Sequence, residues 1–119
     1  MAAPNLINVT SVYGRTTSTT IGTAITVLLS NPSTSSKSYK ITALYVANID
    51  NALTGRISVD YYRSSISIRL IDRMAVDPGN SLVVITRDSA LYLEEGDSIR
   101  AYSDQVGLIH ITMGYEISG

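Results

Sequence analysis

Few residues in this chain of 119 could carry out catalysis, because it has a single histidine and no cysteine. A nucleophilic triad needs a base beside its nucleophile, and His110 is the only imidazole in the sequence. No serine lies in a Gly-x-Ser-x-Gly turn, and His110 falls on the more polar face of a predicted strand. We therefore expect a surface or interface histidine and a protein that is not an enzyme.

The acidic residues show no recognisable metal-binding pattern. One histidine without cysteine cannot supply the ligands of a zinc site. Glu94, Glu95 and Asp97 lack the alternating acidic spacing of a calcium loop, and no phosphate-binding glycine motif is present. We expect these acids to form a solvated turn in which Gly96 adopts a positive φ, and we predict no cofactor and no metal.

Two other carboxylates lie inside predicted strands. Asp60 is expected on an outward face, away from any cleft that could hold a pair of catalytic acids. Asp72 adjoins Arg69 and Arg73, so the sequence predicts a surface ion pair there.

Arginine and tyrosine gather on one predicted hairpin and offer the best candidate for binding. The net charge of −1 gives no general electrostatic case for nucleic acid or anionic membranes. Arginine and tyrosine are also enriched at protein interfaces, so we expect a protein partner rather than nucleic acid. The candidate interface residues are Tyr62, Arg63, Arg69, Arg73, Tyr92 and Tyr102.

The chain has eight tyrosines but no phenylalanine or tryptophan. Tyr39, Tyr61 and Tyr115 fall on core phases of predicted strands, and Tyr45 could do so too. The alternative for the remaining tyrosines is a sugar-binding groove, which would require Tyr62, Tyr92 and Tyr102 to converge.

The elements that must position these side chains are strands, since β-branched and aromatic residues are abundant and no stretch has helical spacing. Apolar and polar residues alternate with period two, and turn signals recur about every ten residues. Tyr13–Thr20, which is polar and rich in threonine, is expected to be a linker. The predicted strands are Leu6–Val12, Ile21–Leu29, Tyr39–Asn48, Gly55–Arg63, Ile66–Arg73, Ser81–Thr86, Leu91–Leu93, Ser98–Ser103 and Leu108–Ile117.

Eight or nine short strands predict an all-β fold, a single-domain antiparallel β-sandwich or jelly roll over residues 1–119. Residues 1–20 could form an extended N-terminal arm that pairs with a neighbour, or the first strand of the protein's own sheet. No signal peptide and no apolar run long enough to cross a membrane is evident, so we expect no membrane partner.

Several stretches of strand and turn residues follow one another in a fixed order over nearly the whole chain. They are Pro4–Gly14, Tyr39–Asn48 (YKITALYVAN), Ile57–Asp60, Pro78–Ile85 (PGNSLVVI), Leu91–Ser98 (LYLEEGDS) and Gly114–Ser118. This pattern resembles small virion structural proteins of tailed bacteriophages, in particular cyanophages. The arginine-rich hairpin Tyr62–Arg73 departs from the pattern of that family.

The resemblance implies a non-enzymatic component of the virion, assembled in the host cytoplasm. We expect a capsid decoration or cement protein that binds the lattice of the major capsid protein, stabilises the shell and forms a homo-oligomer, with a trimer as the first guess. The alternative is a neck, tail or fibre-attachment protein, with a possible role in binding carbohydrate at adsorption.

Overall fold

The computed structural model describes residues 12–119, which form nine strands and one short 3-10 helix, η1 (Arg87–Ser89). This content confirms the predicted all-β class. Within the described residues no helix has the length and apolarity needed to cross a bilayer. The strands are β1 (Val12–Ile21), β2 (Thr26–Ser30), β3 (Ser38–Asn48), β4 (Gly55–Arg63), β5 (Ile66–Val76), β6 (Ser81–Ile85), β7 (Leu91–Leu93), β8 (Ser98–Ser103) and β9 (Ile109–Ser118).

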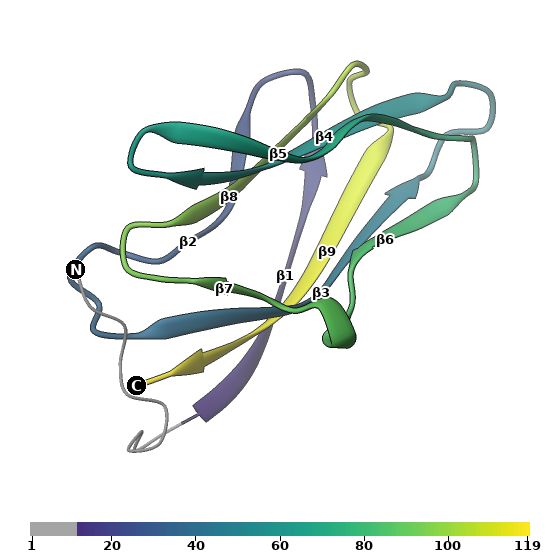
Figure 1. Ribbon diagram of the computed structural model, residues 1–119. Helices are drawn as coiled ribbons and strands as arrows, with labels where there is room; N and C mark the ends of the chain where they lie inside the picture. The colour runs from purple at the N-terminus through teal and green to yellow at the C-terminus, as the bar shows by residue number, and fades with distance from the viewer. Residues whose placement is uncertain (1–11) are drawn as a thin grey trace.

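The strands pair as nested hairpins that are folded over into two sheets (Figure 1). The innermost hairpin is β4–β5, and around it β3 pairs with β6 and β7, β2 with β8, and β1 with β9. Further pairing of β9 with β3 and of β8 with β4 gives sheet A, in the order β1-β9-β3-β6 with β7 also on β3, and sheet B, in the order β2-β8-β4-β5. This topology is that of a jelly roll, as the sequence predicted.

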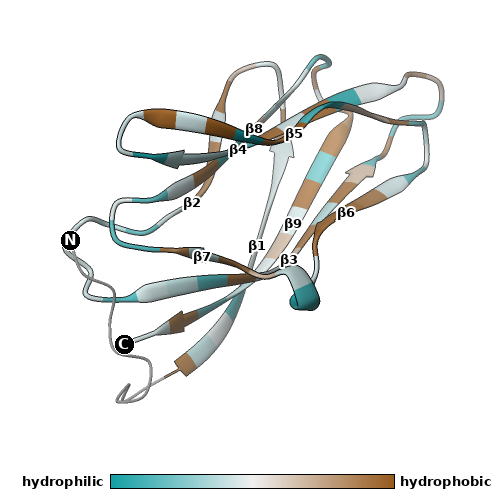
Figure 2. Cartoon of the chain, in the orientation of Figure 1, coloured by the Kyte–Doolittle hydropathy of each residue, from teal (hydrophilic) through white to brown (hydrophobic). Residues whose placement is uncertain are grey.

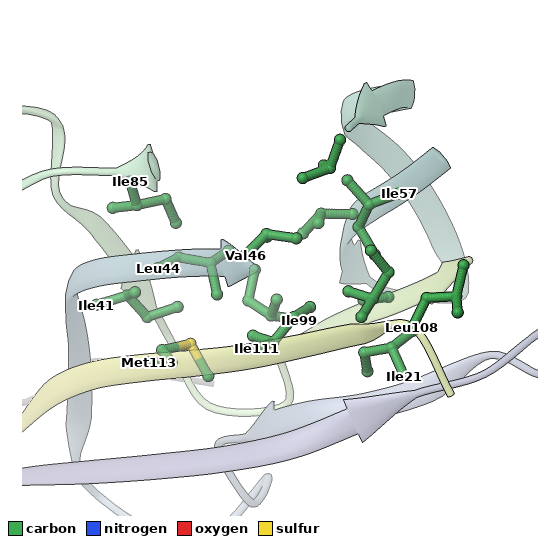
Figure 3. Close-up of a cluster of buried hydrophobic side chains, with 14 of the residues drawn as sticks. Ile21, Ile41, Leu44, Val46, Ile57, Ile85, Ile99, Leu108, Ile111 and Met113 are labelled. Atoms are coloured by element: carbon green, nitrogen blue, oxygen red, sulfur yellow. The ribbon is translucent and has the colours of Figure 1, made fainter. Parts of the chain in front are cut away.

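The core lies between the inner faces of the two sheets, where isoleucines dominate (Figure 3). Hydrophobic and hydrophilic residues alternate along β9, so one side of the strand packs inward and the other faces solvent (Figure 2). Ile41, Ile57 and Val59 all point inward, because none of the three is exposed. The largest fully buried side chains include Ile21, Ile41, Leu44, Ile57, Leu93, Ile99, Ile109, Ile111 and Met113.

The β4–β5 hairpin also follows the prediction. Ser64 and Ser65 connect the strands with φ values of 52° and 64°, which is the geometry of a two-residue hairpin turn. β5 is longer than expected and continues to Val76.

Two local predictions are wrong. The expected linker Tyr13–Thr20 belongs to β1, which pairs with β9 over ten residues, and the strand expected from Ile21 begins only at Thr26. The threonines of this segment are polar, but their β-branched side chains fit a strand well. The expected strand Leu6–Val12 lies outside the described residues, apart from Val12.

The regular alternation expected along β3 is interrupted. The register of β3 against β9 shifts between Ile41 and Ala43, so Leu44 and Val46 continue the buried face and Tyr45 is 49% exposed. Tyr45 is therefore not a core tyrosine. A β-bulge moves the following side chains to the opposite face, and composition alone does not reveal it.

Candidate interaction surface

The outer face of sheet B brings together three of the predicted interface residues. Along β4 the side chains of Asp60 and Tyr62 point away from the core, since Val59 and Tyr61 point inward. The register places Asp60 opposite both Arg100 of β8 and Arg69 of β5. We call the following set the arginine–tyrosine face: Asp60, Tyr62, Arg69, Arg100 and Tyr102.

Each arginine of this face stacks on a tyrosine. The Cζ atom of Arg100 lies 3.5 Å from the centre of the Tyr62 ring, and the Cζ atom of Arg69 lies 5.4 Å from the centre of the Tyr102 ring. The Arg69 side chain crosses over β4 to reach Tyr102 on β8 and forms an ion pair with Asp60 on the way. The guanidinium planes are thus held in place, so little conformational entropy remains to be lost on binding a partner.

Asp60 lies on the outward face of β4, as expected, but Arg69 covers it. Its side chain points outward in the strand pattern but is only 7% exposed. Burial alone would lower the pKa of Arg69, but the charge of Asp60 and the contact with Tyr102 together raise it above its usual range. Arg69 therefore stays fully charged.

Arg73 joins this face at its margin. Asp72 forms ion pairs with both Arg69 and Arg73, which confirms the predicted surface pair. Arg73 has a positive φ of 49°, and its N–H donates to Ser58 Oγ at 3.0 Å. The Arg73 side chain is 75% exposed and is available to a partner.

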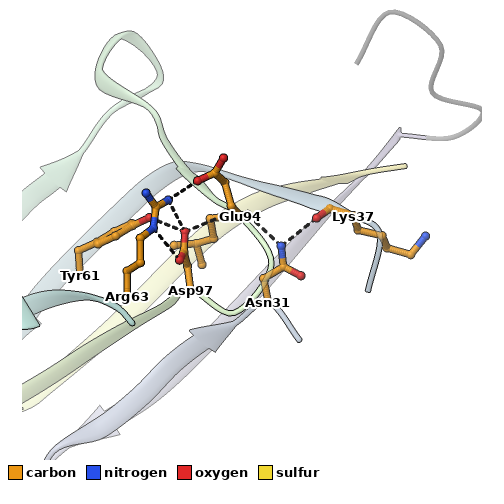
Figure 4. Close-up of polar contacts among 7 residues, drawn as sticks. Asn31, Lys37, Tyr61, Arg63, Glu94 and Asp97 are labelled. Atoms are coloured by element: carbon orange, nitrogen blue, oxygen red, sulfur yellow. Dashed lines mark hydrogen bonds and ion pairs between the residues drawn. The ribbon is translucent and has the colours of Figure 1, made fainter. Parts of the chain in front are cut away.

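Arg63 lies elsewhere, in a cluster at one end of the sandwich (Figure 4). Its Nε and Nη2 atoms donate to the two carboxylate oxygens of Asp97 at 2.8 and 2.6 Å, and Nη2 also pairs with Glu94 at 2.5 Å. Asp97 further accepts hydrogen bonds from the Tyr61 hydroxyl and from the Glu94 N–H.

This end cluster corrects the expectation of a solvated turn at Glu94–Asp97. The Asp97 side chain is fully buried, and Glu95 is 7% exposed. Burial would raise the pKa of Asp97, but its hydrogen bonds from Arg63 and Tyr61 hold it below the usual value. Burial and the neighbouring Asp97 raise the pKa of Tyr61 well above its usual value.

Asn31 ties the loop before β3 to the same turn. Its Nδ2 donates to the carbonyl oxygens of Lys37 and Leu93, each at 2.9 Å. Its N–H donates to the Asp97 carbonyl, and its own carbonyl accepts from Gly96, whose φ is positive as predicted. The contacts of Arg63 within this cluster are those of a structural residue.

Tyr92 lies on the other sheet. It pairs with Lys40 across β7 and β3, and the Lys40 Nζ atom is 5.8 Å from the ring centre. Because Leu93 points into the core, Tyr92 points outward from sheet A, whereas Tyr62 and Tyr102 point outward from sheet B. The three rings do not converge on one groove.

The remaining residues that could bind a metal or take part in catalysis do not cluster. Over residues 12–119 no group of three or more His, Asp or Glu side chains could hold a metal ion, and His110 is exposed on the outer side of β9.

Sequence reasoning overlooked Arg100, whose Nε is buried and makes no hydrogen bond within the described part of the chain. The alternation of Ser98, Arg100 and Tyr102 along β8 was the signal that could have placed it beside Tyr62.

Comparisons with known proteins support the fold. No protein-family model and no curated protein matches the chain. Among solved structures, a chain described in the words "Bacillus endospore appendages form a novel family of disulfide-linked pili" aligns with a TM-score of 0.50 and 11% identity. The alignment covers 99% of this chain and 95% of the other. At this identity the similarity shows only a shared fold. The alignment extends over almost the whole of both all-β chains.

Proposed function

We propose that the protein is a non-enzymatic structural component of a tailed-phage virion, a capsid decoration protein that binds the lattice of the major capsid protein. The observation that carries this proposal is the arginine–tyrosine face. It presents charged and aromatic side chains that are already ordered, which is the composition of energetically important residues at protein interfaces. Contacts of this kind, repeated at every lattice position, would stabilise a shell through multivalency.

The structural neighbour supports an assembling subunit in a general way. That neighbour belongs to disulfide-linked pili of Bacillus endospore appendages. Disulfide linkage cannot be transferred, because this chain has no cysteine. Under this proposal, copies of the chain would associate without disulfides.

The proposal is tested on particles. Cryo-electron microscopy of intact virions should show density for the protein at symmetric positions on the shell. Purified protein should also bind shells that lack it. Arg73→Glu reverses an exposed charge at the margin of the arginine–tyrosine face and should weaken binding, whereas Arg87→Glu in η1 should not. The absence of shell density, with no binding by the unaltered protein, would refute the proposal.

The same cryo-electron microscopy experiment distinguishes the capsid from the alternative location at the neck or tail. Density at the neck or tail would assign the protein to those parts of the particle. A carbohydrate-binding role would then have to depend on Tyr62 and Tyr102 without Tyr92, since Tyr92 belongs to the other sheet.

A further inference from the structure

The edge of sheet A formed by β1 is long and regular. β1 pairs with β9 over ten residues without a shift in register. No strand among residues 12–119 pairs with its other edge, and Figure 1 shows β1 as the outermost strand of its sheet. Within residues 12–119, the outer backbone groups of β1 therefore face no other strand.

The other edges of the sandwich carry features that discourage pairing between molecules. β6 and β7 have only five and three residues, and β2 has five residues and a shift in register. β5 is long, but its register against β4 shifts twice, and it carries the charges of Asp72 and Arg73. β1 has no proline and no bulge, and Arg15 is its only charged residue, so it has little of the usual protection of an edge strand.

The middle of β1 has a symmetric sequence. Thr16-Thr17-Ser18-Thr19-Thr20 reads the same in both directions, with Ser18 at its centre. In an antiparallel pair related by a twofold axis at Ser18, Thr17 would lie opposite the partner's Thr19, and Thr16 opposite the partner's Thr20. We propose that two copies of this chain pair through β1 in this way and form one continuous sheet.

The charges and side chains of β1 fit this arrangement. In this register Arg15 lies opposite the partner's Ile21, so no like charges face one another across the pair. The register also gives four threonine–threonine pairs around the central Ser18 pair, and threonine–threonine pairs are among the favourable cross-strand contacts. Thr17 and Thr19 line a groove of about 250 Å³ whose other walls include Val27 and Met113. The second copy would lie beside this groove, where Val27 is 52% exposed.

This inference rests on the proposed structural role and deepens it, because a twofold contact gives an even number of copies. A trimer in solution would overturn it.

A single cysteine provides a direct test, because the chain has none of its own. In the proposed dimer the two copies of residue 18 face each other across an antiparallel pair, at about 4.5–5.5 Å between Cα atoms, within the range that a disulfide spans. Ser18→Cys should therefore form disulfide-linked dimers of twice the 12.8 kDa monomer mass under mild oxidation. Ser67→Cys, which is exposed on β5, is the matched control and should remain largely monomeric on a non-reducing gel.

Charge at the same position gives an independent test. In analytical ultracentrifugation the unaltered chain should form dimers, and Ser18→Lys should weaken dimerisation by about tenfold or more, since two lysines would face each other. Ser18→Asp should behave in the same way, but an equal mixture of the two variants should dimerise again. Recovery in the mixture shows that both variants are folded.

The outcomes separate this inference from the proposed function. If Ser18→Cys forms no more cross-linked dimer than Ser67→Cys, or if Ser18→Lys leaves the dimer intact, the β1 contact is wrong. Binding to phage shells would then still support the virion role. If the dimer forms through Ser18 but the protein is missing from particles, the inference stands and the proposed function fails.

Discussion

At the scale of single residues, Asp97 connects parts of the chain that are far apart in sequence. It accepts hydrogen bonds from Tyr61 and Arg63, 36 and 34 residues away, and from the neighbouring Glu94 N–H. These contacts join the end of β4 to the turn before β8. A buried carboxylate with several donors is stabilised as an anion, while loss of the carboxylate would leave the donors without an acceptor.

Replacing Asp97 with alanine should therefore destabilise the fold. We expect a loss of about 2–3 kcal/mol, less than for a wholly buried pair because the Arg63 side chain is 43% exposed. Urea unfolding followed by circular dichroism measures the change. Asp88→Ala in η1, at an exposed position, is the control and should change stability by less than about 0.5 kcal/mol. Equal effects of the two substitutions would contradict the structural role of Asp97.

The same carboxylate should make stability depend on pH. The pKa of Asp97 in the folded protein lies below its usual value of 3.8. The unfolded chain therefore takes up a proton first as the pH falls, so this contribution to stability is fully present above about pH 4 and is lost through the lower folded pKa. The melting temperature of the unaltered protein should fall more steeply below pH 4 than that of Asp97→Asn. Parallel curves for both proteins would disprove this prediction.

Which residue contacts could be predicted depended on their separation along the chain. The pairing of Asp72 with Arg69 and Arg73 was predicted, because all three lie within five residues. The stacking of Arg100 on Tyr62 and the burial of Asp97 depend on the register between distant strands and on a turn that packs back against β4. A local sequence pattern predicts neither the register between distant strands nor the packing of this turn.

At the scale of elements, the β4–β5 hairpin offers a stabilising change. Ser64 and Ser65 both have positive φ values, a conformation that serine adopts at a cost and that asparagine and glycine favour. The double substitution Ser64→Asn and Ser65→Gly should raise stability by about 0.5–1 kcal/mol. Chemical denaturation measures this gain. As a control, Ser67→Gly inside β5 should lower stability. If the double variant were also less stable than the unaltered protein, the turn would have another geometry.

The elements themselves were predictable where side-chain alternation and turn residues agree. Where they agree, they predicted the first and last residues of β4 correctly, as well as the hairpin that connects it to β5. The prediction failed for β1, where threonines and serine replace the apolar residues because the strand lies at the edge and buries only Ile21. It also failed within β3, where the bulge after Ile41 changes which residues face the core.

At the scale of the whole molecule, the jelly roll places the two proposed contacts on different sheets. β1 forms the edge of sheet A, while the arginine–tyrosine face covers the outside of sheet B. A subunit could therefore pair with a second copy through β1 and bind a lattice through sheet B at the same time. In that case the second copy adds a second binding site, and the pair should bind more tightly than one subunit.

Two substitutions should separate these contacts. Ser18→Lys should yield monomers that still bind phage shells, but with an affinity lowered by about tenfold or more through the loss of bivalence. Arg73→Glu should yield normal dimers that bind shells poorly, because its site is on the other sheet. Sedimentation measures the dimerisation of each variant, and co-pelleting with shells measures its binding to the lattice. If either substitution abolished both properties while the fold stayed intact, the two contacts would form a single surface, and the arrangement proposed here would have to be abandoned.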